Sequence, residues 1–109
     1  MCGRAYETYT QEEVYFRYLN KLPAQPLPIK PNYNLAPSQY SPVVFMENQV
    51  RQIQFFRWGL LPSWAKDIQS ASKYSLINAR FEEIEKKRSY KVPFEKRRCI
   101  VPLSGFFVW

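Results

Sequence analysis

Histidine is absent from the 109-residue chain, and cysteine occurs only at positions 2 and 99. Without histidine the chain cannot build a histidine-based catalytic triad or a histidine-ligated metal site. Two cysteines by themselves are too few for a zinc site. The sequence therefore predicts neither a metal nor another cofactor.

Long apolar runs are also lacking. No apolar segment approaches the roughly 20 residues that a membrane-spanning helix needs, and none follows Met1 as a signal peptide would. We therefore expect an intracellular, cytoplasmic protein without a membrane partner, in which both thiols are reduced.

What is abundant is apolar, aromatic and positively charged. Apolar residues make up 46% of the chain and aromatic residues 17%, which is typical of a globular protein. The length allows one domain at most. The net charge of +7, from 16 Lys and Arg against 9 Asp and Glu, favours a polyanionic partner such as nucleic acid. Charge alone fits a basic soluble protein with no such partner equally well.

The first half of the chain has clear local signals. Thr10 and Glu13 form a capping-box pattern, and apolar residues then recur at helical spacing, which predicts a helix over residues 11–21. Five prolines between residues 23 and 37 predict extended or turned chain. Residues 43–46 and 50–58 read as two strands joined by a turn at 47–49.

The second half is less regular. Residues 59–64 predict a loop with an exposed Trp64, residues 74–77 a short strand, and residues 79–88 a helix with Asn78 as its N-cap. Residues 99–103 predict a buried strand. Residues 104–109 are apolar and strand-like up to the last residue, so we expect a truncated chain, the N-terminal part of a single domain.

The beginning of the chain carries a reactive pair of groups. Removal of Met1 would leave Cys2 with a free α-amine and a thiol on adjacent carbons. A thiolate is a strong nucleophile, and an α-amine is partly unprotonated near pH 8. Together they can trap an aldehyde, first as a Schiff base and then as a thiazolidine ring. The alternative is that Cys2 is simply the second residue of an ordinary protein.

Several blocks along the chain resemble those of the SOS response-associated peptidase (SRAP) family, in the family's order and spacing. They are Met1-Cys2-Gly3-Arg4, Tyr33-Asn34-Leu35-Ala36-Pro37, Arg57-Trp58-Gly59-Leu60-Leu61-Pro62-Ser63-Trp64, Ile77-Asn78-Ala79-Arg80, Arg97-Arg98-Cys99, and Gly105-Phe106-Phe107 followed by Trp109.

This resemblance implies an α+β fold with a mainly antiparallel, β-barrel-like core and short helices. It also implies binding of abasic sites in single-stranded DNA and a thiazolidine DNA–protein crosslink through the mature N-terminal cysteine, here Cys2. By the same resemblance, Asn78 orients the abasic sugar, Arg4 and Arg80 hold phosphates, and Trp64 packs against bases. Guanidinium groups suit phosphates, and aromatic rings stack on bases of any sequence.

Each of these residues also has a simpler explanation. Asn78 could be only a helix cap, and Arg80 could pair with Glu83 on the same helix. Trp58 ends an apolar strand and suits the core better than a DNA contact. The basic cluster, defined here as Lys86, Lys87, Arg88, Lys91, Lys96, Arg97 and Arg98, could follow the phosphates or form a solvated surface.

The sequence departs from the family pattern in two places. Val108 stands where the family has a glutamate credited with acid/base steps, and the family's histidine belongs to a later block, before which this chain ends. We therefore expect slow crosslinking, and self-association or a complementary C-terminal fragment at open strand edges. Two other interpretations stay open. One is a non-catalytic nucleic-acid-binding fragment or a truncated product without function, and the other is an N-terminal-nucleophile amidotransferase, which also begins Met-Cys-Gly.

Overall fold

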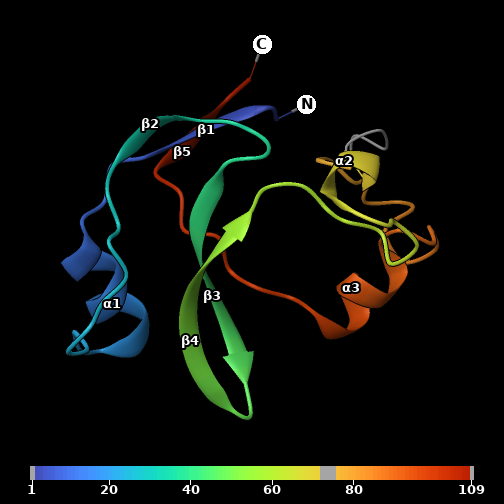
Figure 1. Ribbon diagram of the computed structural model, residues 1–109. Coiled ribbons are helices and arrows are strands. Elements are labelled where there is room, and N and C mark those ends of the chain that lie inside the picture. The colour runs from blue at the N-terminus through green and yellow to red at the C-terminus, as the bar shows by residue number, and fades with distance from the viewer. Residues whose placement is uncertain (1, 72–75, 109) are drawn as a thin grey trace.

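The computed structural model describes residues 2–71 and 76–108 of the chain. The elements are β1 (Arg4–Glu7), α1 (Gln11–Leu19), β2 (Asn32–Leu35), β3 (Tyr40–Glu47), β4 (Val50–Arg57), α2 (Ile68–Ala71), α3 (Lys91–Lys96) and β5 (Gly105–Phe107). The strands form two antiparallel sheets, β2-β1-β5 and β3-β4 (Figure 1). The expected α+β class with short helices is confirmed, and the described residues form no closed barrel.

Helix α1 forms as its sequence predicts. The Thr10 side chain accepts a hydrogen bond from the Glu13 N–H, and the Glu13 carboxylate accepts one from the Thr10 N–H, which completes the capping box. The helix ends at Leu19, two residues before the predicted end. The following residue, Asn20, caps it in the left-handed conformation with φ of 58°. The helix buries Val14 and Tyr15 against β3 and β4, where they join the core with Ile29, Val44 and Ile53.

The β3–β4 hairpin also follows the prediction, although β3 begins three residues earlier. Its register runs from Tyr40 opposite Arg57 to Glu47 opposite Val50. Asn48 and Gln49 form the two-residue turn, with φ of 51° and 65°. Two positive φ values give a turn whose twist matches that of the flanking strands, and asparagine adopts them readily.

The three-stranded sheet joins distant parts of the chain. Strand β1 lies between β2 and β5, so that Ala5 pairs with Leu35 on one side and with Phe106 on the other. Strand β5 confirms the strand-like ending, although residue 109 lies outside the described residues. Gly105 lies opposite Tyr6, whose ring occupies the space of any added Cβ. Both ends of the chain therefore meet in one sheet (Figure 1).

The predicted helix over residues 79–88 is wrong. Residues 81–90 form successive turns, in which the Glu83 N–H bonds to the Arg80 carbonyl and the Lys86 N–H to the Glu83 carbonyl. These two hydrogen bonds span three residues, and the bond from the Lys87 N–H to the Glu83 carbonyl spans the four of an α-helix but is not continued into a helix. The short helix α3 begins only at Lys91. Of the strand predicted at 74–77, residues 74 and 75 lie outside the described residues, and residues 76 and 77 form a turn.

The predicted buried strand over residues 99–103 is also wrong. Ile100 forms a single bridge with Val44, in which each N–H bonds to the other's carbonyl. Cys99, Ile100, Val101 and Leu103 are exposed, whereas Pro102 is buried. Among the described residues, no strand pairs continuously with this segment, so its apolar composition alone does not produce a ladder.

None of the described helices combines the length and the apolar character needed to cross a membrane.

Candidate functional site

Cys2 lies two residues before the start of β1 and is half-buried. Its thiol lies 3.8 Å from the Arg4 carbonyl oxygen, a contact to which it donates weakly. Cys2 also lines an apolar cavity of about 350 Å³, together with the half-buried Trp58 and with Cys99. Cys2, whose thiol belongs to the aminothiol predicted from the sequence, therefore lies beside an apolar cavity.

Asn78 reaches Cys2 from 76 residues along the chain. Its side-chain Nδ2 donates a hydrogen bond of 3.0 Å to the Cys2 carbonyl oxygen. No helix begins after Asn78, so the simpler explanation of this residue as a helix cap is wrong. The structure thus brings together the two residues predicted to be catalytic, while their chemical roles stay predictions.

Arg4 is held close to the same place. Its Nε donates to the Asn34 Oδ1 at 3.1 Å, and one terminal nitrogen donates to the Gly3 carbonyl at 3.2 Å. A guanidinium has five N–H donors, so Arg4 retains donors for an anion while these two bonds restrain it. Sequence reasoning did not assign Asn34 a role, although Asn34 lies within one of the family-like blocks.

Arg80 lies beside Asn78 on the exposed surface. With Asn78, Lys87 and Tyr90 it lines a hollow of about 650 Å³. The predicted ion pair between Arg80 and Glu83 does not form, because the Glu83 carboxylate pairs instead with Lys87 at 3.9 Å. Arg80, Lys87 and Glu83 all line this hollow, so its lining carries one net positive charge next to the contact between Asn78 and Cys2.

Trp64 is less accessible than the sequence predicts. It is half-buried, and the guanidinium carbon of Arg88 lies 4.1 Å from the centroid of its ring. This distance is that of a cation–π contact, so Arg88 covers part of the ring on which a base would stack. Sequence reasoning did not predict the contact between Trp64 and Arg88, because the two residues lie far apart in the chain and share no local pattern.

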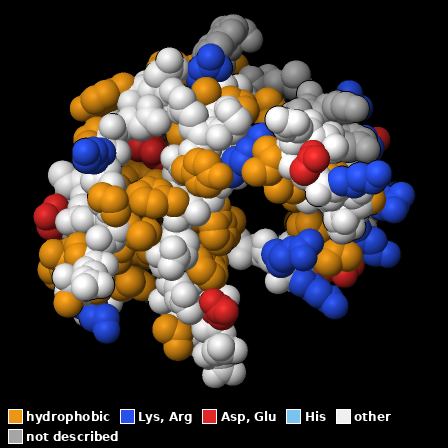
Figure 2. Space-filling view, viewed as in Figure 1, with side chains coloured by type: hydrophobic (Ala, Val, Ile, Leu, Met, Phe, Trp, Pro, Cys, Tyr) orange, Lys and Arg blue, Asp and Glu red, His pale blue; other side chains and the backbone are white. Residues whose placement is uncertain are grey.

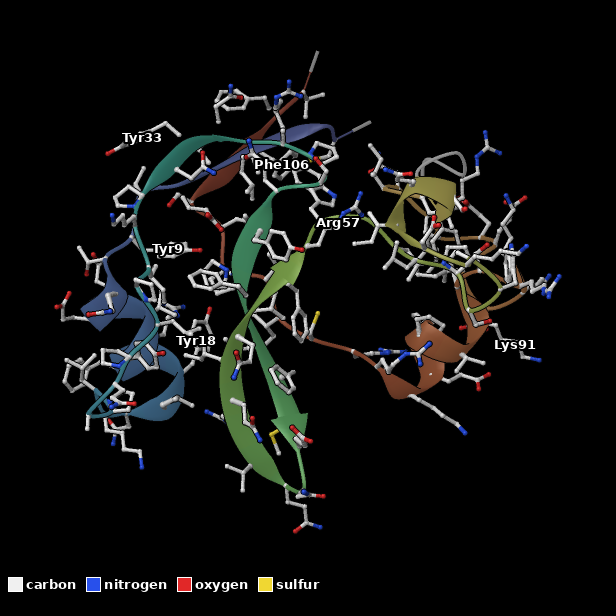
Figure 3. All side chains as sticks on the ribbon, viewed as in Figure 1. Tyr9, Tyr18, Tyr33, Arg57, Lys91 and Phe106 are labelled. Carbon is white, nitrogen blue, oxygen red and sulfur yellow. The ribbon has the colours of Figure 1, made fainter. Side chains whose placement is uncertain are left out.

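The basic cluster is exposed at all seven positions, Lys86, Lys87, Arg88, Lys91, Lys96, Arg97 and Arg98. In the space-filling view, Lys and Arg side chains gather over the part of the molecule that carries α3, and Lys91 projects outward from it (Figures 2 and 3). Some of the binding capacity of Arg98 is already used within the chain. Its guanidinium carbon lies 3.9 Å from the Phe94 ring centroid, and its Nε donates a hydrogen bond to the Phe94 carbonyl.

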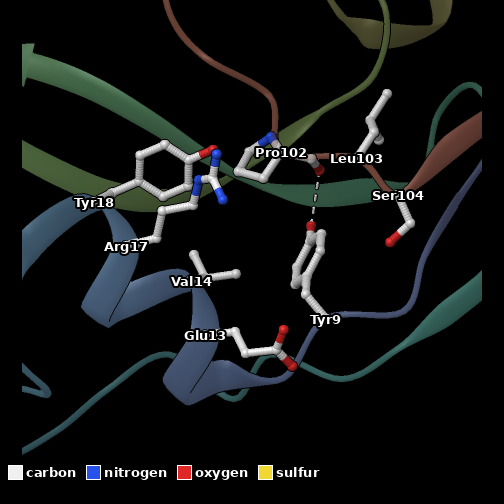
Figure 4. A pocket seen from close by; sticks show the side chains of 8 residues that line it. All are labelled: Tyr9, Glu13, Val14, Arg17, Tyr18, Pro102, Leu103 and Ser104. Atoms are coloured by element: carbon white, nitrogen blue, oxygen red, sulfur yellow. Dashed lines mark hydrogen bonds between the residues drawn. The ribbon is translucent and has the colours of Figure 1, made fainter.

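A buried carboxylate, that of Glu7, was not predicted from the sequence. Glu7 is only 2% exposed, and it accepts hydrogen bonds from the Ser41 hydroxyl and, at 2.7 Å, from the Tyr9 hydroxyl. The same Tyr9 hydroxyl lies 3.0 Å from the Pro102 carbonyl (Figure 4). Burial, and then the hydrogen bond to Glu7, raise the pKa of Tyr9, so this hydroxyl stays protonated and can link Glu7 to the Pro102 main chain.

The second thiol differs from Cys2. Cys99 was predicted to be buried, but the residue is exposed overall. Desolvation nevertheless raises the pKa of the Cys99 thiol, which disfavours its nucleophilic thiolate form. Within residues 2–71 and 76–108, no three His, Cys, Asp or Glu side chains gather as a metal site would require.

Comparison with known proteins adds a family to this geometry. The family model described as SOS response associated peptidase (SRAP) matches residues 1–109. The abasic site processing protein YMR114C of Saccharomyces cerevisiae is 41% identical over 80 residues, which cover 73% of this chain and 21% of that protein. The abasic site processing protein YoqW of Bacillus subtilis is 39% identical over 79 residues, or 72% of this chain and 34% of that protein.

A mammalian relative shows the same partial coverage. The abasic site processing protein HMCES of Mus musculus is 38% identical over 89 residues, which cover 72% of this chain and 25% of that protein. The chain thus spans about a fifth to a third of the length of these relatives. No solved structure matches the chain. Because the family model covers every residue, the chain belongs to the SOS response associated peptidase (SRAP) family.

Proposed function

We propose that this chain binds abasic sites in single-stranded DNA and links to them covalently through Cys2. The observation that carries the proposal is the hydrogen bond from Asn78 to the Cys2 carbonyl, which gathers Cys2, Asn78 and Arg80 at one surface. The relatives' names as abasic site processing proteins support the same substrate. Family membership also favours this function over that of an N-terminal-nucleophile amidotransferase.

The chemistry needs only the aminothiol and the aldehyde of the ring-opened abasic sugar. After Met1 is removed, the Cys2 α-amine attacks the aldehyde carbon, and loss of one water gives an imine. The Cys2 sulfur then bonds to the imine carbon while the thiol proton passes to the nitrogen. The product is a thiazolidine ring, and no oxidant or reductant is consumed. Cys2 is therefore the proposed nucleophile.

The surrounding side chains supply binding rather than proton transfer. Arg4 and Arg80 are proposed phosphate ligands, and the basic cluster extends the positive surface beside the hollow. Trp64 is the proposed stacking partner for a base, which would displace Arg88 from its ring. Val108 cannot transfer a proton and is 69% exposed, so proton transfer at the sugar falls to water and crosslinking is slow.

The two sheets offer a place for further strands. Among the described residues, β4 pairs with β3 alone, and a single bridge at Ile100 connects the hairpin to the segment leading into β5. Phe56 and Val101, which are both exposed, line the apolar cavity beside Cys2. We propose that a second copy or a complementary polypeptide adds strands here and gives the core its barrel-like form.

A labelled single-stranded oligonucleotide with one abasic site tests the covalent step. The chain should yield a band that resists denaturation, whereas an oligonucleotide whose aldehyde has been reduced to an alcohol should yield none. Cys2→Ala should abolish the band, and Cys99→Ala serves as the matched control that should keep it. A band that survives Cys2→Ala, or that disappears with Cys99→Ala, would show that the nucleophile is assigned wrongly.

The replacement of the family glutamate by Val108 favours one alternative, a non-catalytic fragment that only binds nucleic acid. Such a fragment would retard the abasic oligonucleotide in a native gel and leave no band after denaturation. The same two gels therefore separate binding from crosslinking.

A further inference from the structure

Asn78 is held at two points although it lies in irregular chain. Its side chain donates to the Cys2 carbonyl at 3.0 Å, and its own main-chain carbonyl accepts a hydrogen bond of 2.9 Å from the Tyr90 hydroxyl. Residues 76–80 include no helix or strand that would otherwise fix this backbone. The position of the Asn78 side-chain amide therefore depends on hydrogen bonds that involve side chains rather than on a ladder of main-chain hydrogen bonds.

Tyr90 is well placed to act as the fixed end of this chain of contacts. It is the N-cap residue of α3, and its N–H bonds to the Lys87 carbonyl at 3.0 Å. Tyr90 is half-buried, and its phenol, which is protonated at neutral pH in any tyrosine, has its pKa raised further by desolvation. The ring also forms part of the hollow that Asn78 and Arg80 line.

We propose that Tyr90 is a positioning residue for the Cys2 reaction: its hydroxyl holds the Asn78 main chain, and the Asn78 side chain holds Cys2. This inference rests on the proposed function. The Asn78 contact restrains the Cys2 carbonyl, which shares the Cα that carries both the α-amine and the thiol-bearing side chain. Fixing that carbonyl limits the directions in which the two reacting groups point, and a small misplacement of reacting groups slows a reaction strongly.

The test compares two tyrosine-to-phenylalanine changes. Tyr90→Phe removes the hydroxyl and keeps the ring, while Tyr33→Phe makes the same change at an exposed tyrosine of β2 that projects away from its sheet (Figure 3). Crosslinking is followed under single-turnover conditions at increasing concentrations of abasic single-stranded DNA. The fit gives a maximal rate and a half-saturating DNA concentration for each variant.

Tyr90→Phe should lower the maximal rate about threefold to tenfold, which is the range expected for one lost hydrogen bond, with an unchanged half-saturating concentration. Tyr33→Phe should change neither value. In an Asn78→Ala background Tyr90→Phe should have no additional effect, because the side chain that transmits the restraint is gone. A general loss of packing would instead add to the effect of Asn78→Ala.

The outcomes separate this inference from the proposed function. A wild-type chain that forms no crosslink overturns the proposed function and this inference with it. A wild-type chain that crosslinks while Tyr90→Phe keeps the full maximal rate overturns this inference alone. So does a Tyr90→Phe variant that changes only the half-saturating concentration, since Tyr90 would then contact DNA, or one whose loss adds fully to that of Asn78→Ala.

Discussion

Replacing Asn78 by aspartate should disturb the Cys2 site more than removing the side chain altogether. The Asn78 Nδ2 is a donor that faces the Cys2 carbonyl oxygen at 3.0 Å. Aspartate has nearly the same shape, but it is ionised at neutral pH and has only acceptors. Asn78→Asp therefore sets a charged oxygen against a carbonyl oxygen, whereas Asn78→Ala leaves the carbonyl to water.

The magnitude follows from these two effects. Loss of an exposed hydrogen bond costs about 1 kcal/mol, which corresponds to about a fivefold fall in the crosslinking rate for Asn78→Ala. Turning the contact into a repulsion costs about as much again. Asn78→Asp should therefore raise the activation free energy by about 2 kcal/mol, which lowers the crosslinking rate about thirtyfold. The negative charge also weakens the attraction of Arg80 and Lys87 for phosphate, and this appears separately as a higher half-saturating DNA concentration.

The assay is the time course of the denaturation-resistant band at saturating abasic single-stranded DNA. Asn48→Asp is the matched control, because it adds the same charge in the β3–β4 turn, where Asn48 has φ of 51° and aspartate tolerates that conformation. Asn48→Asp should leave the rate unchanged. Asn78→Asp with the wild-type rate, or with a rate above that of Asn78→Ala, would refute the role of this hydrogen bond.

Four further outcomes are expected from the same structure. Affinity for single-stranded DNA should fall with salt with a log–log slope of about −0.7 per contacted phosphate, and a salt-independent affinity would contradict this. Trp64→Ala should weaken binding by about 1–3 kcal/mol whatever the sequence, and an unchanged affinity of this variant would contradict the stacking role. Tyr9→Phe should lower the free energy of unfolding by about 2 kcal/mol in a urea titration, because it removes a hydrogen bond to the buried Glu7 carboxylate; a loss below about 0.5 kcal/mol would contradict that account. Analytical ultracentrifugation should show self-association through the open strand edges, and a monomer that unfolds cooperatively with about 5 kcal/mol or more of stability would argue against it.

Much of the first half of the chain was predictable from its sequence because its signals are local. The Thr10 and Glu13 capping box forms within one turn of chain, and it produced helix α1 where the pattern placed it. The two strands of the hairpin are separated by a two-residue turn at Asn48, so their pairing also depends on neighbouring residues. The family-like blocks, the first of which contains Cys2, pointed to the family that the comparison shows.

The failures lie where local composition competes with distant contacts. Residues 79–88 have helix-forming side chains, yet Asn78 bonds to Cys2 and Tyr90 instead of capping a helix, and the chain between them closes in turns. The apolar residues 99–103 pair with β3 at one position, the bridge between Ile100 and Val44, and do not form a strand. In both segments the tertiary context outweighs the local propensity.

By itself the sequence determined the nucleophile candidate, the local elements of the first half and the family, since each depends on residue identity and short spacing. Only the tertiary structure decided that β1 pairs with both β2 and β5, that Glu7 is buried with Tyr9, and that Asn78 meets Cys2 across 76 residues. Such contacts close long loops, and the entropy lost in closing them is offset only by the sum of packing and hydrogen bonds over the whole fold. A short stretch of sequence therefore cannot predict these long-range contacts.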